Sequence, residues 1–181
     1  MGKILFPPQK CLVCGILLAE GYSQDELTRS IEEAFGPIDD MSPYRIFDGY
    51  SLYYEKEMGR NIQRFFITFQ KLFDAQLLAD YKLMSNNLEN QLFGSPDKIT
   101  RAVNIDPGYI DLAKLIVAST KDASYRVYLK EGIYAQPMLQ FIKGRFVPFE
   151  WTYPDYKNDI FIRFFESARE KYKKICRERQ T

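Results

Sequence analysis

Histidine is absent from this sequence of 181 residues. Its absence removes the side chain that most often acts as a general base near neutral pH and most often ligates metals. Serine and cysteine mechanisms that need a histidine partner are therefore excluded. Any proton transfer would have to use Asp, Glu, Lys, Tyr or a metal-bound water.

An excess of charge of either sign is also missing, because 25 Lys and Arg balance 24 Asp and Glu. No overall field draws the chain onto nucleic acid or an anionic membrane, so a charged partner must be recognised locally. The N-terminus lacks a signal-peptide core, and no apolar run approaches the roughly 20 residues that cross a bilayer. Together with only three cysteines, these features favour a cytoplasmic protein with no membrane contact.

Two of the cysteines, Cys11 and Cys14, form a C-x-x-C spacing inside an apolar run. Redox and zinc sites place such cysteines in a turn or at a helix start, where both sulfurs converge. On a strand, residues three apart point to opposite faces of the sheet. The sequence therefore predicts two core thiols that hold neither zinc nor a disulfide.

Hydrophobic periodicity predicts one α+β domain over residues 1–181, with a mostly antiparallel sheet and two or three helices packed on one face. The first half follows the order β-α-β-β-α-β of a ferredoxin-like half, and a β-meander is expected after it. The expected helices span residues 23–35, 74–93 and 158 onward. The expected strands span residues 10–20, 51–59, 62–70, 101–105, 115–119, 125–129, 133–142 and 145–149, with Asp106-Pro107-Gly108 as one of the turns.

The segments NIDPGY, ASTKD, GIYA, WTYPDY and YYEKEMGR resemble those of an uncharacterised prokaryotic family, a domain of unknown function. The resemblance runs over nearly the whole chain and implies no established activity, although some members carry a loose GTP-binding label. A P-loop needs G-x-x-x-x-G-K-[ST], and no segment of this chain fits that pattern. Tyr125 and Gln136 stand where histidine and glutamate are common in the family. A family chemistry that depends on that pair would not carry over to this chain.

Alternation along the expected strands gathers polar side chains on one face of the sheet. This polar set comprises Asn104, Asp106, Arg126, Tyr128, Tyr134 and Gln136. The opposite positions are expected to be core, namely Val127, Leu129, Ile133, Ala135, Leu139 and Phe141. Two interpretations remain open, a merely solvated face or the floor of a ligand pocket. In the second, the segments 53–60 and 151–156 form walls that bring Glu55, Glu57, Arg60, Trp151 and Asp155.

The pocket interpretation predicts a small anionic ligand, such as a phosphorylated metabolite or a nucleotide, with Arg64, Lys121 and Arg126 as anion partners. No cofactor is implied with certainty. If the site does chemistry, its carboxylates would act as a base or hold Mg²⁺ through water. These carboxylates are Glu55, Glu57, Asp106 and Asp155. The alternative is a non-catalytic module that binds RNA or protein with exposed tyrosines and the basic terminal helix.

Overall fold

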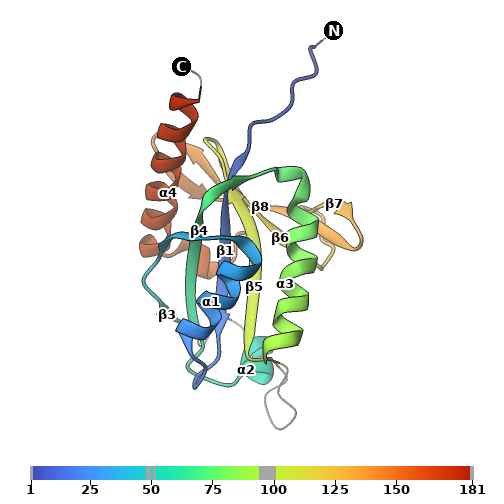
Figure 1. Cartoon of the computed structure of the whole chain (residues 1–181), viewed down its shortest axis with the longest axis vertical. Helices are drawn as coiled ribbons and strands as arrows, with labels where there is room; N and C mark the ends of the chain where they lie inside the picture. The colour runs from blue at the N-terminus through green and yellow to red at the C-terminus, as the bar shows by residue number, and fades with distance from the viewer. Residues whose placement is uncertain (1, 48–49, 51, 94–100, 180–181) are drawn as a thin grey trace.

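The computed structural model describes residues 2–47, 50, 52–93 and 101–179, and these residues form one nine-stranded antiparallel sheet with helices on both faces (Figure 1). The predicted α+β class with a mostly antiparallel sheet is confirmed. The strands are β1 Lys10–Leu18, β2 Ile38–Met41, β3 Arg45–Ile46, β4 Gln63–Phe73, β5 Val103–Ile110, β6 Lys114–Ser119, β7 Val127–Lys130, β8 Ile133–Ile142 and β9 Arg145–Pro148. The helices are α1 Gln24–Phe35, α2 Leu52–Met58, α3 Leu78–Phe93 and α4 Asp159–Glu178, with short 3₁₀ turns η1 Ala75–Leu77 and η2 Pro154–Lys157.

The strands lie in the order β2-β4-β1-β5-β6-β8-β7, with β3 also on β4 and β9 also on β8. The first four strands of this order have the ferredoxin-like arrangement, since β4 lies between β1 and β2 and α1 is the crossover. The second strand of this half is β2, which the sequence did not predict, and not the expected strand at 51–59. The meander holds for the neighbours β5–β6, β7–β8 and β8–β9. It is interrupted because one side of the long strand β8 pairs with β6, which leaves β7 at the sheet edge.

Alternation along β1 separates the two faces of the sheet. Leu12, Cys14 and Ile16 pack in one cluster with residues of α1 and α3. Cys11 and Val13 pack in another cluster with residues of α4. The two thiols therefore lie on opposite faces, as predicted, and burial raises the pKa of both.

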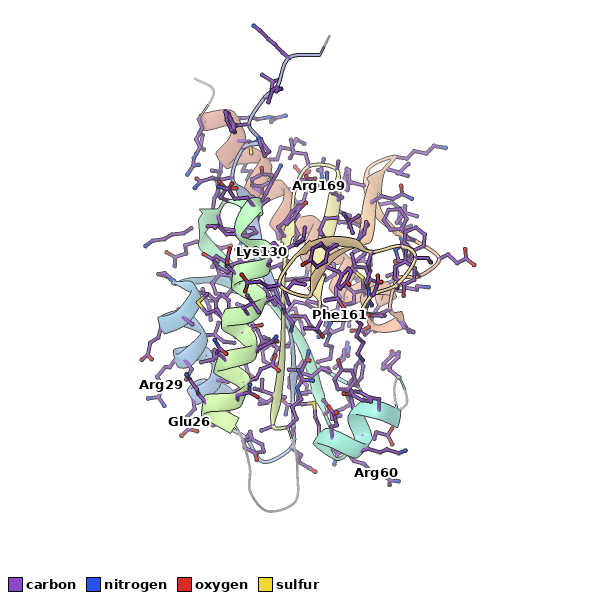
Figure 2. All side chains as sticks on the ribbon, turned by 90° about the vertical axis from the view of Figure 1, so that its right-hand side faces the viewer. Glu26, Arg29, Arg60, Lys130, Phe161 and Arg169 are labelled. Carbon is purple, nitrogen blue, oxygen red and sulfur yellow. The ribbon has the colours of Figure 1, made fainter. Side chains whose placement is uncertain are left out.

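Two helices, α1 and α3, share one face as predicted, whereas α4 and α2 lie on the other. In Figure 2, α1 and α3 stand on one side of the sheet and α2 on the opposite side. Tyr54 and Met58 of α2 pack against Leu17, which occupies the same face of β1 as Val13. The second face is therefore covered at its two ends, by α4 and by α2, and stays open between them.

The predicted strand at 51–59 is wrong, because residues Leu52–Met58 form α2. Glu55, Lys56 and Glu57 are good helix formers, and the helix places Tyr54 and Met58, four residues apart, on the same buried side. The aromatic pair Tyr53-Tyr54 suggested a strand, but tertiary packing of one face decides the outcome.

The predicted turn at Asp106-Pro107-Gly108 is also wrong, because β5 continues through it. Pro107 loses no bond to β1, since the backbone groups of Ile105, two residues earlier, point away from β1 toward α3. Gly108 is required there because a Cβ on it would lie 2.2 Å from the Ile116 carbonyl oxygen. The Pro-Gly pair marks the point where β5 meets β6 and not a turn.

The expectation that Val127 and Leu129 are core is wrong as well. Their side chains are 64% and 39% exposed. β7 is an edge strand that projects beyond the helices, so neither of its faces is covered.

Replacing Gly108 with alanine is expected to lower the free energy of unfolding by at least about 2 kcal/mol, because the new methyl group meets backbone that cannot turn aside. Urea denaturation measures this loss. Gly2→Ala is the matched control, since nothing lies within 4 Å of its added Cβ. An alanine at position 108 as stable as the control would contradict this account of the β5–β6 crossing.

Candidate functional site

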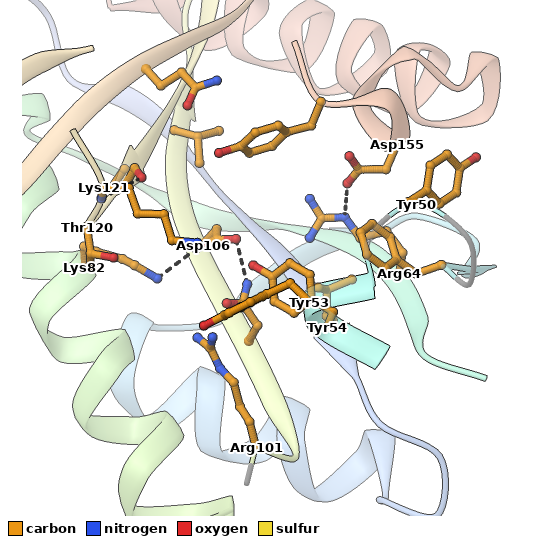
Figure 3. Close-up of a pocket in the computed structure, with 18 of the residues that line it drawn as sticks. Tyr50, Tyr53, Tyr54, Arg64, Lys82, Arg101, Asp106, Thr120, Lys121 and Asp155 are labelled. Carbon is orange, nitrogen blue, oxygen red and sulfur yellow. Dashed lines mark hydrogen bonds and ion pairs between the residues drawn. The ribbon is translucent and has the colours of Figure 1, made fainter. Parts of the chain in front are cut away.

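A pocket of about 370 Å³ opens on the second face of the sheet, between α2 and η2 (Figure 3). Five strands supply its floor, because the open centre of this face lies over β1, β4, β5, β6 and β8. The floor residues are Leu17, Arg64, Asn104, Asp106, Val117, Ala118 and Gln136, and the walls are Phe47, Tyr50, Tyr53, Tyr54, Lys82, Asn86, Arg101, Ser119, Thr120, Lys121, Tyr153, Pro154 and Asp155.

The sheet itself is open beside this pocket. β6 pairs only with Gly108–Ile110 of β5, so the earlier part of β5 has no strand on that side among the described residues. Side chains of α3 bind this free edge instead. Lys82 Nζ donates to the Ile105 carbonyl oxygen at 2.7 Å, and the Ile105 N–H donates to Glu89 Oε1 at 2.7 Å.

Lys82 also reaches past the β5 edge into the pocket on the far face. Its Nζ lies 2.9 Å from Asp106 Oδ1, and the Asn104 amide donates to Asp106 Oδ2 at 2.6 Å. Figure 3 shows Lys82, Arg101 and Arg64 extending toward the region around Asp106 from different sides. A helix on one face thus delivers a cation to a site on the other.

Arg64 forms the second ion pair, with Nε 2.8 Å from Asp155 Oδ2 of η2. Its guanidinium lies over the Phe66 and Tyr156 rings, 4.4 and 5.0 Å from their centroids. Gly15 of β1 leaves the space for it, because a Cβ there would be 3.0 Å from Arg64 Nη2. Since Arg64 and Asp155 are almost fully buried, each depends on the other for its charge.

Burial and the cations act on these carboxyl groups in opposite directions. Burial raises the pKa of Asp106, but Lys82 and Arg64 outweigh it and hold that pKa below its ordinary value. For Asp155 burial prevails over Arg64 and raises the pKa. Burial likewise raises the pKa of Glu89 in spite of Lys82 and Arg101. Asp106 is therefore the carboxylate whose charge the site secures most firmly.

An aromatic wall closes the side of the pocket nearest α2. Tyr54 meets Phe47 edge to face at 5.7 Å and meets Tyr53 in the same manner at 5.4 Å. The Lys121 ammonium, from the loop after β6, lies 4.6 Å from the centroid of the Tyr53 ring. These contacts hold a tyrosine face at the pocket mouth beneath a cation.

Six predicted site residues line the pocket together, from five different elements or loops. They are Arg64, Asn104, Asp106, Lys121, Gln136 and Asp155. Strand alternation placed part of the floor correctly, because Asn104, Asp106 and Gln136 of the predicted polar set do lie in the pocket lining.

The other predicted residues lie outside the pocket lining. Arg126 lies behind it and donates to Gln136 Oε1 at 2.7 Å, to the Lys121 carbonyl oxygen at 2.6 Å and to the Tyr153 hydroxyl at 2.5 Å. Glu55 and Glu57 both belong to α2. Glu57 Oε2 lies 3.8 Å from Arg101 Nη1.

The remaining three predicted positions, all aromatic, pack elsewhere. Trp151 is stacked between Tyr125 and Phe149 and donates its indole N–H to the Pro137 carbonyl oxygen. Tyr128 and Tyr134 pack against each other on the exposed β7–β8 pair.

Sequence reasoning missed Lys82 and Arg101 because α3 was read only for its apolar stripe. A signal was present, since Lys82, Ser85 and Glu89 repeat at helical spacing and all three are buried. Arg101 was assigned to a strand, whereas its Nη2 pairs with Glu89 and its Nε donates to the Val103 carbonyl oxygen.

Two classes of feature are absent from the part of the chain that the structure describes. No three His, Cys, Asp or Glu side chains gather there as a metal-binding group. None of the helices found in those residues is long and apolar enough to cross a membrane.

A family model for a domain of unknown function, DUF4416, matches residues 8–172. The chain belongs to this family. Neither a curated protein nor a solved structure matches the chain. Membership in DUF4416 covers β1 through most of α4, including every residue that lines the pocket, and supplies no activity.

Lys82→Met is expected to lower the free energy of unfolding by about 3 kcal/mol at pH 7, because it removes the nearest cation from Asp106 and a donor from the buried Ile105 carbonyl. The depressed pKa of Asp106 contributes stability above its ordinary value of 3.8, and this contribution is lost as the pH falls through the folded-state pKa. The deficit of the variant should therefore be smaller below pH 3.8, as Asp106 takes up a proton, than at pH 7. Urea denaturation at several pH values measures it.

Lys130→Met is the control, because Lys130 pairs with Asp80 at the exposed surface. This variant should unfold like the wild type at every pH. A deficit of Lys82→Met that does not change with pH would show that Lys82 acts by packing and not by charge.

Proposed function

We propose that this protein binds a small anionic ligand in the pocket between α2 and η2. One observation carries the proposal: four cationic side chains line the pocket, but only two of the lining side chains are carboxylates. The cations are Arg64, Lys82, Arg101 and Lys121, and the carboxylates are Asp106 and Asp155. Adding the adjoining Glu57, Glu89 and Arg126 still leaves one positive charge in excess.

The cations differ in what already holds them. Arg64 pairs with the buried Asp155 and Lys82 pairs with Asp106, whose side chain is 24% exposed, and these contacts fix both cations in place. Lys121 has no carboxylate partner among the described ion pairs and lies on the Tyr53 ring at the pocket mouth. Arg101 is 26% exposed, but it too pairs with a buried carboxylate, Glu89. Lys121 is therefore the cation that a ligand anion would meet first.

A phosphorylated metabolite or a nucleotide suits these groups, because guanidinium and ammonium donors match phosphate oxygens. Binding is better supported than catalysis. Asp106 and Asp155 each neutralise a cation already, so a role as general base or as Mg²⁺ ligand would first have to break that pair. We therefore propose ligand binding as the function, and catalysis would be an additional step.

The alternative of an RNA- or protein-binding module has one observation in its favour, the exposed tyrosines Tyr50, Tyr53 and Tyr153 at the pocket rim. Part of the basic terminal helix argues against it. Lys171 pairs with Asp39 and Asp40, and Lys173 pairs with Glu170. This positive charge is neutralised within the protein itself.

A thermal-shift screen with inorganic phosphate, sugar phosphates, nucleotides and dicarboxylates tests the proposal, since a ligand specific to the folded state raises the midpoint. We expect at least one anion to raise it. Lys121→Gln should weaken that binding about tenfold, as loss of a charge-assisted hydrogen bond implies. Lys130→Gln, a charge change away from the pocket, should leave it unaltered. Equal binding by wild type and Lys121→Gln would place the anion elsewhere.

A further inference from the structure

We infer that the ligand of this pocket is a phosphate monoester that also carries a planar aromatic ring. This inference rests on the proposed function and narrows its substrate class. The pocket joins two chemically different surfaces, a charged region where Arg64, Lys82 and Arg101 surround Asp106, and an aromatic wall on α2 (Figure 3). A ligand that contacts only one of these surfaces would leave the other exposed to water.

The aromatic wall is built as a platform for a ring. Tyr53 is 49% exposed, yet its ring is fixed by the edge-to-face contact with Tyr54, which in turn packs on Phe47. Tyr50 and Tyr153, 44% and 40% exposed, border the same pocket. Exposed aromatic faces held in place beside a cavity favour stacking of a planar group.

Lys121 connects the ring site to the anion site. Its ammonium now covers the Tyr53 ring, 4.6 Å from the centroid, in a cation–π contact worth about 0.5–1 kcal/mol at exposed positions. A ligand ring would take that place on Tyr53. The displaced ammonium would then bind the ligand's phosphate, so the exchange costs little and joins the two subsites.

Charge favours the phosphate monoester. The lining residues carry an excess of two positive charges, which falls to one when the adjoining Glu57, Glu89 and Arg126 are included. A phosphate monoester carries about 1.5 to 2 negative charges at neutral pH, which lies within this range. A triphosphate would bring more negative charge than the lining balances, next to Asp106 and Asp155. The volume of about 370 Å³ lies at the small end of ligand sites, which suits one ring with one phosphate.

Isothermal titration calorimetry with five probes tests this inference. AMP, UMP and riboflavin 5′-phosphate combine a ring with a phosphate monoester, ribose 5-phosphate lacks the ring, and adenosine lacks the charge. We expect a ring-bearing monophosphate to bind about tenfold more tightly than either partial probe, which is the scale of one stacking contact. Its affinity should also rise between pH 5 and pH 7.5, because the second phosphate proton leaves near pH 6.

Two tyrosine variants show where the ring binds. Tyr53→Leu should remove the tenfold advantage of the ring-bearing probe and leave ribose 5-phosphate binding within about twofold, because only stacking is lost. Tyr53→Phe should retain the advantage. Tyr128→Leu is the matched control, since Tyr128 is 58% exposed on β7 away from the pocket lining, and it should change neither affinity.

The outcomes separate this inference from the proposed function. Ribose 5-phosphate binding as tightly as every ring-bearing probe would overturn the ring, and dicarboxylates binding more tightly than all phosphates would overturn the phosphate. Both results would leave an anion site in place, provided that Lys121→Gln weakens the binding. Adenosine binding as tightly as AMP, or no anion whose binding responds to Lys121→Gln, would overturn the inference and the proposed function together.

Discussion

The contact of Lys82 with Ile105 and Asp106 determines how the rest of this structure is arranged. β5 pairs with β6 only over Gly108–Ile110. In the described part of the chain, the earlier part of β5 therefore has an unpaired edge inside the domain, where backbone N–H and C=O groups without hydrogen-bond partners would be costly. The ammonium of Lys82 and the carboxylate of Glu89 bind the Ile105 carbonyl and N–H. The sheet can therefore open at its centre without losing hydrogen bonds, and the opening admits a helix side chain to the far face.

The pocket follows from this opening and from the way the far face is covered. α4 packs over one end with Phe161 and Phe165, and α2 packs over the other with Tyr54 and Met58. Between them the strands present polar side chains, which the buried pairs Lys82–Asp106 and Arg64–Asp155 fix in position. Such pairs add little net stability compared with an apolar core, so their presence favours a role in binding.

Local sequence patterns predicted the capped helices well, because their signals are contained in a few neighbouring residues. Ser23 accepts the Glu26 N–H at the start of α1, and Asn158 does the same for Ile160 in α4. Alternation also placed Asn104 and Gln136 on one face. Three other features depend on contacts between segments far apart in the sequence. They are the position of β8 between β6 and β7, the helix α2, and the contact of Lys82 with the β5 edge. From sequence alone, a lysine on a helix is expected to be solvated, because the unpaired strand edge that it contacts is not known.

Because Lys82 closes the sheet edge and also lines the pocket, the two roles limit where a ligand anion can bind. An anion that drew Lys82 away from Asp106 would take the nearest cation from that carboxylate and one of two side-chain donors from the Ile105 carbonyl. Arg64 is limited in the same way by Asp155. Arg101 is limited as well, because its Nη2 pairs with the buried Glu89 and its Nε donates to the Val103 carbonyl oxygen. Lys121 has no carboxylate partner among the described ion pairs, and its ammonium lies on the Tyr53 ring. The pairs Lys82–Asp106, Arg64–Asp155 and Arg101–Glu89 thus shape the pocket, and Lys121 is the cation that can exchange its ring contact for a ligand anion.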